Sequence, residues 1–207
     1  MRKLIILGAG GHGRVLRETA TAANRWASVF HLDDDVASDR STVDVVGPIS
    51  ELQSFDNQIH DVALGVGNNS FRLELATRCM SLGFAMPPVL HPAATVSPSV
   101  KIGAASVIFA GAVVCTGSVI GMAVIVNHGA IVDHDCKLED GVHISPGVSL
   151  AGGVHVGRSS WIGVGVAVRD RVNIGSGVIA GAGAAIVSDV RDGTTVVGVP
   201  AREINAN

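Results

Sequence analysis

An apolar residue recurs at every sixth position between Val96 and Ile186. A second column, four residues after the first, contains only Val, Ala, Ser and Cys. The first column has sixteen members, all Val, Ile or Leu except Ala180: Val96, Ile102, Ile108, Val114, Ile120, Val126, Val132, Leu138, Ile144, Leu150, Val156, Ile162, Val168, Ile174, Ala180 and Ile186. Self-similarity at a fixed period, held this long, predicts a repeat architecture, here a parallel β-helix.

The six-residue period also predicts the shape of the repeat. Six residues suit one short strand and one corner, and three such faces close a triangular coil of about eighteen residues, with coils stacked about 4.8 Å apart. Glycine lies three residues after the core position nine times, at Gly111, Gly117, Gly129, Gly141, Gly147, Gly153, Gly165, Gly177 and Gly183. Glycine adopts positive φ at little cost, so we expect the corners to be left-handed. The period does not give the hand of the coil.

Residues 1–90 lack this period and alternate between strand and helix patterns. We expect strands at 3–7, 28–32 and 62–66 and helices at 14–23 and 70–82. Such alternation predicts a small parallel sheet flanked by helices. The chain therefore divides into a Rossmann-like domain, residues 1–90, and a β-helix domain, residues 91–207.

The first strand is followed by Gly8-Ala9-Gly10-Gly11-His12-Gly13, which opens a helix, and Asp33 and Asp34 follow about twenty residues later. This is the spacing of a dinucleotide fingerprint, whose glycines let a phosphate approach the helix N-terminus. NAD, another nucleotide, or a tight turn without a ligand would each explain it. Only half of a two-lobed dinucleotide fold is present, so another nucleotide is favoured.

Gly67 and Asn68 lie where the third strand ends, at the edge where open α/β sheets bind ligands. A structural reading is also open, in which Asn69 or Ser70 caps the next helix. Arg72 is then either a phosphate contact or, more commonly for a helix, a solvated charge.

His134 is an exception among the outward positions of the repeat. The register puts it at a corner, between Asp133 and Asp135. A carboxylate at one ring nitrogen fixes the tautomer and leaves the other nitrogen to take a proton. A solvated surface pair is the competing interpretation, since Asp tolerates the left-handed corner position. Gly152, eighteen residues on, leaves open space beside the histidine. His143 is either a ligand contact or a surface residue.

Composition narrows the classes of function. The chain has 207 residues, 47% hydrophobic and 16% charged, with a net charge of −3 and no Tyr. It can bury a sizeable core, and neither the charge nor the aromatic content favours nucleic acid as a partner. No apolar run has the length of a signal-peptide core or a membrane span, so we expect a cytoplasmic protein without membrane insertion.

The hexapeptide columns resemble those of the left-handed β-helix acyltransferases, which are obligate trimers with active sites between subunits. Further motifs look like those of the sugar N- and O-acetyltransferases of the bacillosamine, perosamine and sialic-acid pathways, and they run over nearly the whole chain. They are the glycine loop at 8–13, Leu32-Asp33-Asp34, Gly65-Val66-Gly67-Asn68-Asn69, His91-Pro92, Val132-Asp133-His134-Asp135-Cys136 and Gly198-Val199-Pro200-Ala201.

The resemblance implies roles for individual residues. His134 matches the general base, and Asp135 the acid that orients it, where many relatives carry Glu. The residues that match the nucleotide-sugar site are Gly11, His12, Gly13, Asp33, Asp34, Gly67 and Asn68. The residues that match the acetyl-CoA site are His143, Gly152, Val164 and Ala182.

The implied function is an acetyl-CoA-dependent N-acetyltransferase that acts by direct transfer on the 4-amino group of a nucleotide-linked amino-dideoxy sugar. O-acetylation of a sialic acid or polysaccharide is the alternative. A remote alternative is a zinc enzyme like the β-helix carbonic anhydrases, with ligands among His128, His134, His143 and His155. The spacing of these histidines matches no familiar ligand set, so we expect no metal. Whether the nucleotide is UDP, GDP or dTDP stays open.

Overall fold

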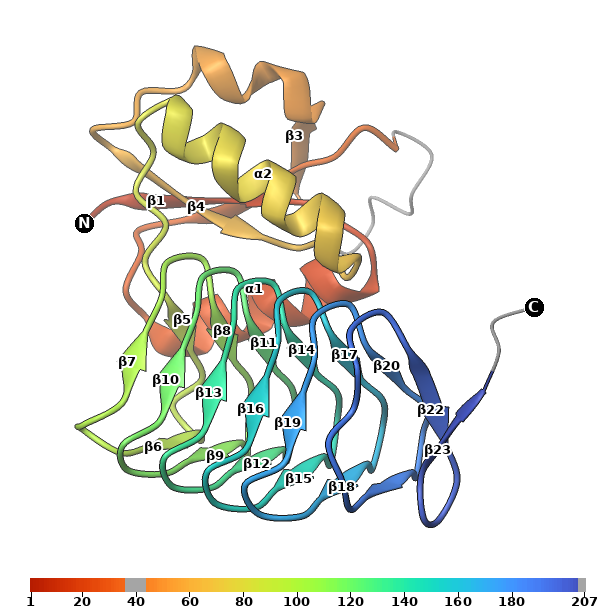
Figure 1. Ribbon diagram of the computed structural model, residues 1–207. Helices are drawn as coiled ribbons and strands as arrows, with labels where there is room; N and C mark the ends of the chain where they lie inside the picture. Colours follow the sequence, from red (N-terminus) through yellow and green to blue (C-terminus); the bar gives the residue numbers. More distant parts are fainter. Residues whose placement is uncertain (36–43, 205–207) are drawn as a thin grey trace.

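The computed structural model describes residues 1–35 and 44–204. An N-terminal α/β unit rests on a three-faced coil of short parallel strands (Figure 1). The predicted fold class, a small Rossmann-like domain followed by a left-handed parallel β-helix, is confirmed. None of the helices in these two ranges is long and apolar enough to cross a membrane.

The N-terminal unit contains a four-stranded parallel sheet in the order β3-β2-β1-β4. Its elements are β1 (Lys3–Leu7), α1 (Gly11–Ala23), β2 (Val29–Leu32), β3 (Val45–Gly47), the 3₁₀ helix η1 (Ile49–Ser54), β4 (His60–Leu64) and α2 (Asn69–Ser81). Leu4 to Leu7 of β1 are fully buried, as expected for a parallel strand covered on both faces. The helix predicted at 14–23 begins earlier, at Gly11, and β3 and η1 were not predicted.

The coil has three faces, each built of parallel two-residue strands that repeat every eighteen residues, and the three-residue strands β22 and β23 depart from this pattern at its far end. The helix-covered face consists of β5 (Val89–Leu90), β8 (Val107–Ile108), β11 (Ile125–Val126), β14 (His143–Ile144), β17 (Trp161–Ile162), β20 (Ile179–Ala180), β22 (Thr195–Val197) and the antiparallel β23 (Arg202–Ile204). The uncharged face consists of β6 (Thr95–Val96), β9 (Val113–Val114), β12 (Ile131–Val132), β15 (Ser149–Leu150), β18 (Ala167–Val168) and β21 (Ala185–Ile186). The charged face consists of β7 (Lys101–Ile102), β10 (Val119–Ile120), β13 (Lys137–Leu138), β16 (His155–Val156) and β19 (Asn173–Ile174).

The core and the corners of the coil follow the sequence period. The second residue of each two-residue strand points inward, and the columns at positions six apart form one continuous buried cluster. All nine predicted corner glycines have positive φ. Five other residues share that column and conformation, with φ between 55° and 59°: Ala105, Ala123, Asp135, Ser159 and Arg171. The corner backbone is therefore fixed by the fold even where no glycine relieves it.

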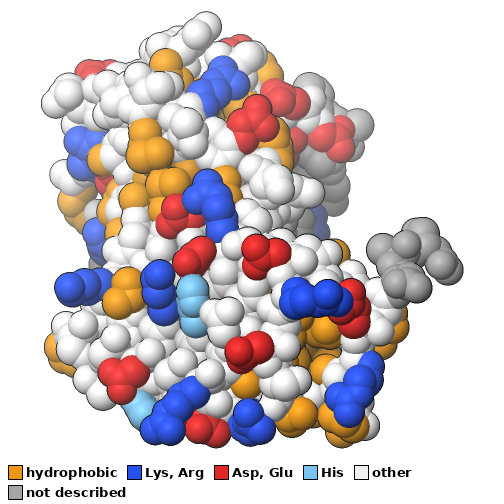
Figure 2. All heavy atoms as spheres, in the orientation of Figure 1, with side chains coloured by type: hydrophobic (Ala, Val, Ile, Leu, Met, Phe, Trp, Pro, Cys, Tyr) orange, Lys and Arg blue, Asp and Glu red, His pale blue; other side chains and the backbone are white. Residues whose placement is uncertain are grey.

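The two units meet on the helix-covered face, where α1 lies along the coil (Figure 1). Phe109 lies outside the core columns, yet it is fully buried in a cluster that also contains Leu16 of α1. The charged face is free of helices, and Figure 2 shows basic and acidic side chains spread over it. One face of the prism is thus covered by the N-terminal unit, and two remain open.

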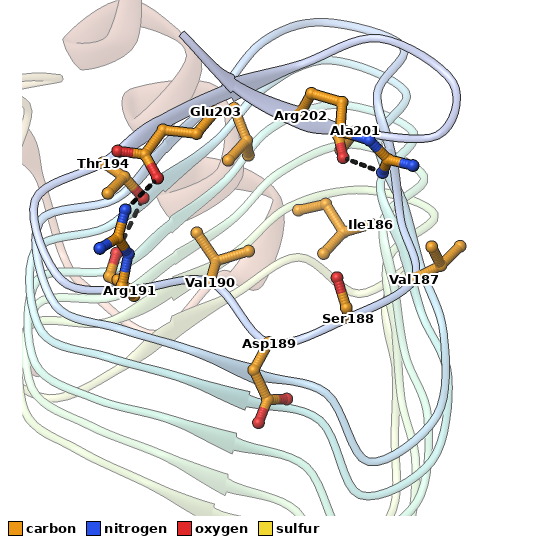
Figure 3. Close-up of a pocket in the computed structure, with 11 residues that line it drawn as sticks. Ile186, Val187, Ser188, Asp189, Val190, Arg191, Thr194, Ala201, Arg202 and Glu203 are labelled. Carbon is orange, nitrogen blue, oxygen red and sulfur yellow. Dashed lines mark hydrogen bonds and ion pairs between the residues drawn. The ribbon is translucent and has the colours of Figure 1, made fainter. Parts of the chain in front are cut away.

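The far end of the coil is closed by β22 and β23. Figure 3 shows Arg191 directed toward Glu203, with which it forms an ion pair of 2.6 Å, and Arg202 turned back to the carbonyl oxygen of Ala201. A hollow of about 180 Å³ lies between these side chains and the last coil. None of the site residues predicted from the sequence lines it.

Candidate functional site

His134 lies at the corner between β12 and β13, with 58% of its side chain exposed. Its Nδ1 is 2.9 Å from the Asp135 carboxylate, while Asp133 accepts a hydrogen bond from the His134 backbone N–H. The hydrogen bond to Asp135, followed by the charge of Asp133, raises the pKa of His134 above its usual value. Asp135, not Asp133, therefore orients the ring, and Nε2 is left free to accept a proton.

The free edge of this ring faces Gly152, one coil further along. A methyl group built on Gly152 would lie 2.6 Å from Cε1 of His134 and closer still to Nε2. Within the described residues, the Gly152 amide N–H donates to no protein acceptor. The space that the sequence predicts beside Gly152 is therefore not empty, because the His134 ring fills the place of the missing side chain. The corner combines a base with a free backbone donor directly beside it.

His143 belongs to a second group of polar side chains, on the helix-covered face. Its Nε2 is 3.3 Å from the Asn127 side-chain amide, and its ring stacks with that of Trp161 at 6.3 Å between centroids. Trp161 is fixed in turn by a hydrogen bond from Nε1 to Ser145. Burial, followed by the charge of Arg72, lowers the pKa of His143 to about 3, so this imidazole is neutral at pH 7.

His12 reaches the same region from the first turn of α1. Its ring meets Phe109 edge-on at 5.5 Å, and Phe109 stacks on His128 at 4.9 Å. Its Nε2 is buried and has no hydrogen-bond partner among the described residues. Burial, followed by the charge of Arg72, lowers the pKa of His12 to about 4. A neutral ring with an unsatisfied nitrogen is suited to meet a polar ligand group.

The glycine loop is packed tightly at one end and open at the other. A side chain at Gly13 would collide with the carbonyl group of Gly8, which is why the chain needs glycine where the helix passes β1. A methyl group at Gly11 would meet nothing within 4 Å. The open side of the loop can therefore admit a ligand at the N-terminus of α1.

Asp33 and Asp34 support the loops at the carboxyl edge of the sheet. The Asp33 carboxylate accepts the backbone N–H of Ala9 in the glycine loop, and Asp34 accepts that of Ile49 at 2.8 Å. Each carboxylate has further acceptor capacity. The structure thus gives both residues a structural function at the place where the sequence predicts a nucleotide contact.

Two expectations about the loop after β4, the cap of α2 and the environment of Arg72, are wrong. The cap of α2 is Asn68, whose Oδ1 accepts the Phe71 N–H at 2.9 Å, and neither Asn69 nor Ser70 is the cap. Arg72 is neither a solvated charge nor a free phosphate contact, because it is 1% exposed and bonded to backbone carbonyl groups. Helical periodicity could not show this, since two of the partners of Arg72, Ala123 and Gly141, lie on the coil.

A hollow of about 560 Å³ separates this loop from the helix-covered face. It is lined by Gly67, Asn68, Asn69, Ser70, His143, Ser159, Trp161, Gly177 and Ile179. The structure therefore brings the predicted residues Gly67, Asn68 and His143 to one place. Trp161 was missed as a site residue, although an outward aromatic in an otherwise aliphatic repeat was a usable signal.

The remaining predicted residues lie elsewhere on the prism. Val164 and Ala182 are exposed at the corner between the helix-covered and uncharged faces. His134 lies at the corner between the uncharged and charged faces, which is opposite the face that carries His143. The predicted site residues of one chain therefore lie in two separate groups, which we call half-sites. No group of three or more His, Cys, Asp or Glu that could hold a metal ion occurs in the part of the chain that the structure describes.

Known proteins are similar to parts of this chain and to the whole of it. Residues 3–79 match the PglD N-terminal domain family. A UDP-N-acetylbacillosamine N-acetyltransferase of Bacillus subtilis (strain 168) is 36% identical over 113 residues, 52% of this chain and 51% of that protein, so the match spans about half of that relative.

Two solved structures are similar over the whole chain. The acetyltransferase domain of PglB from Neisseria gonorrhoeae FA1090 has 45% identity and a TM-score of 0.96, covering 99% of this chain and 100% of that one. The same domain has been solved with acetyl coenzyme A. A perosamine N-acetyltransferase from Caulobacter crescentus, solved with CoA and GDP-perosamine, has 35% identity and a TM-score of 0.94, covering 100% of this chain and 98% of that one.

Proposed function

The chain belongs to the β-helix acetyltransferase family of the PglB domain and the perosamine N-acetyltransferase, and we propose that it acetylates the 4-amino group of a nucleotide-linked amino-dideoxy sugar. Acetyl-CoA is the proposed donor. The observation that carries the proposal is the corner where the Nε2 of His134, whose ring is oriented by Asp135, lies against Gly152 and its free backbone N–H. N-acetylation is preferred to O-acetylation because the relatives of known activity are N-acetyltransferases.

The proposed reaction is direct acyl transfer. The amine attacks the thioester carbonyl carbon while the Nε2 of His134 removes its proton, and the Asp135 carboxylate stabilises the imidazolium that forms. The C–N bond forms, the C–S bond breaks, and the thiolate of CoA leaves and takes up the proton from His134. In this proposal the free N–H of Gly152 donates to the oxyanion. Cys136 is buried, which raises the pKa of its thiol and makes it a poor nucleophile.

The two units divide the binding work in this proposal. Residues 1–90 hold the nucleotide sugar, through the open loop at Gly11 to Gly13, Asp33, Asp34 and the loop with Gly67 and Asn68. Residues 91–207 hold acetyl-CoA along the corners with Gly152, Val164 and Ala182, near His143. Location in the cytoplasm, where acetyl-CoA is available, is part of the same proposal.

A homotrimer would join the two half-sites. The uncharged face lies between the His134 corner and the corner that leads to the helix-covered face, and its outward residues carry no charge: Thr95, Val113, Ile131, Ser149, Ala167 and Ala185. If this face packs against its copies, the His134 corner of one subunit meets the His143 side of the next. Closed rings of this kind are a common symmetry for homo-oligomers.

Purified protein tests the proposal directly. We expect release of CoA thiol with acetyl-CoA and a UDP-, GDP- or dTDP-linked 4-amino sugar, together with a product one acetyl group heavier. Thermal shifts with UDP, GDP and dTDP identify the nucleotide, since a ligand at 100 times its Kd adds about 2.7 kcal/mol. Turnover of sialic acid and of none of the amino sugars would replace the proposal by O-acetylation, and no turnover of either would refute it.

A further inference from the structure

Arg72 is a buried cation that no carboxylate neutralises among the described residues. An arginine has five N–H donors, and all five of its hydrogen bonds here end on uncharged oxygens. Nε donates to Ala123 O at 2.8 Å, Nη1 to Val66 O at 3.2 Å and Gly67 O at 3.0 Å, and Nη2 to Asn69 Oδ1 and Gly141 O at 2.9 Å each. One guanidinium is thus shared by the loop after β4 and by the coil.

The acceptors on the coil follow its period. Ala123 and Gly141 are eighteen residues apart, in the left-handed corner column between the charged and helix-covered faces. Ser159 is the next member of the column, and its carbonyl accepts Asn69 Nδ2 at 3.0 Å. The loop is therefore fastened to three successive coils, twice by Arg72 and once by Asn69.

The hollow begins where these contacts end. Gly177 continues the column one coil further, has no contact of this kind within the described ranges, and lines the hollow with Trp161 and Ile179. Asn68 and Asn69 form the opposite wall. The position of that wall relative to His143 is consequently set by the bonds of Arg72 and Asn69.

The stability of the fold does not by itself explain a buried charge at this position. Burial lowers the pKa of Arg72 to about 10, so the side chain is still protonated at neutral pH and its desolvation is uncompensated by an ion pair. Even a buried ion pair can often be replaced by apolar side chains of similar volume without loss of stability, so a buried charge is weak evidence for a stabilising role. A rigid fork with acceptors on both walls does what an apolar side chain cannot, which is to fix the register of one wall against the other.

We propose that Arg72 is a positioning residue of the acceptor site, which holds the loop of residues 66–69 against the coil and so sets the width of the hollow between Asn68 and His143. The inference rests on the proposed function for what occupies the hollow. Arg72 touches no reacting atom, and it sets the position of the loop through its hydrogen bonds. Its charge also helps to lower the pKa of His12 and His143, and Arg72→Lys keeps that charge.

The test compares Arg72→Met and Arg72→Lys with Arg78→Met, a matched control on an exposed position of the same helix. In both Arg72 variants we expect the KM for the nucleotide sugar to rise about tenfold or more, with a much smaller change in the KM for acetyl-CoA, because only the acceptor wall moves. Lysine keeps the charge but cannot span both walls, so it should not rescue. Arg78→Met should match the wild type.

A second measurement needs no activity. Trp161 lines the hollow and is 48% exposed, whereas Trp26 is 7% exposed, so acrylamide quenching of fluorescence reports on Trp161. We expect stronger quenching of Trp161 in both Arg72 variants than in the wild type, and wild-type quenching in Arg78→Met. An unchanged sugar KM and unchanged quenching, with only a lower Tm, would overturn the proposal, as would full rescue by lysine. A wild-type protein without activity would refute the proposed function instead, while the quenching would still show whether Arg72 positions the wall.

Discussion

Gly152→Ala is the substitution that most directly tests the corner at His134. The backbone of Gly152 is outside the left-handed region, so alanine is compatible with the corner, and the amide N–H that would hold the oxyanion is retained. The nearest atoms to the new methyl group all belong to the His134 ring. That ring is half exposed and can turn away, so we expect the variant to fold.

The structure gives the size of the displacement. The methyl group would lie 2.6 Å from Cε1, where ordinary contact begins at 3.4 Å, so the ring must shift by about 1 Å or the methyl occupies the space that the amine needs. A 1 Å misplacement of a catalytic group costs about 10²-fold in rate, equivalent to about 2.7 kcal/mol of transition-state stabilisation. We expect kcat/KM to fall by about this factor while Tm changes little.

The assay is release of CoA thiol by the wild type, Gly152→Ala, His134→Ala and the double variant. His134→Ala alone should lower turnover by about 10²–10⁴-fold, the usual contribution of a general base. If Gly152→Ala acts only by displacing the imidazole, it should not lower the rate further in a chain that already carries His134→Ala. The effects of the two substitutions on turnover should therefore be strongly non-additive. Activity of Gly152→Ala within about threefold of the wild type would refute the reasoning, because less than 1 kcal/mol would then separate the two.

Three further predictions concern the base and the assembly. Asp135→Asn should shift the acidic limb of the kcat/KM pH profile to lower pH with a lower plateau, because the carboxylate that raises the pKa of His134 is gone and the base stays neutral further into acid; an unmoved limb would assign it to another group. Ile131→Arg should break the proposed trimer, measured by gel filtration with light scattering, and should abolish the release of CoA thiol. Val119→Arg should do neither, because Val119 is about equally exposed, 41% against 43% for Ile131, but lies on the charged face. Equal behaviour of the two variants would refute the assigned interface. Co-expressed His134→Ala and His143→Ala chains should recover about a quarter of wild-type activity through mixed trimers, and no recovery would place both residues of a site on one chain.

The coil could be predicted from the sequence because its constraints are local and repeated. Each six-residue unit contributes one inward aliphatic residue and one corner, so an error at one position would have been contradicted by fifteen others. The outward direction of His134 followed from the same register. The register did not decide which neighbouring carboxylate holds the ring, because Asp133 and Asp135 are both adjacent to His134; the structure assigns that bond to Asp135.

The residues that escaped prediction depend on contacts between distant segments. Arg72 lies 51 residues from Ala123 and 69 from Gly141, and a helical pattern alone describes it as a surface charge. Asn127 has a polar partner in His143 only because the coil turns back on itself. The pairings of Arg72 come from the docking of two units, which leaves no periodic trace in either of them, whereas Asn127 and His143 meet across adjacent turns of the coil.

The proposed division of the site between two chains does have a periodic trace in the sequence. His134 and His143 are nine residues apart, which is half of an eighteen-residue coil, so the prism must place them on opposite sides. No motion within one chain can bring a corner to the face opposite it without breaking the ladder of parallel strands. If both histidines serve one reaction, the second copy is therefore part of the active site itself, and the uncharged face that would join the copies is as necessary to catalysis as the base.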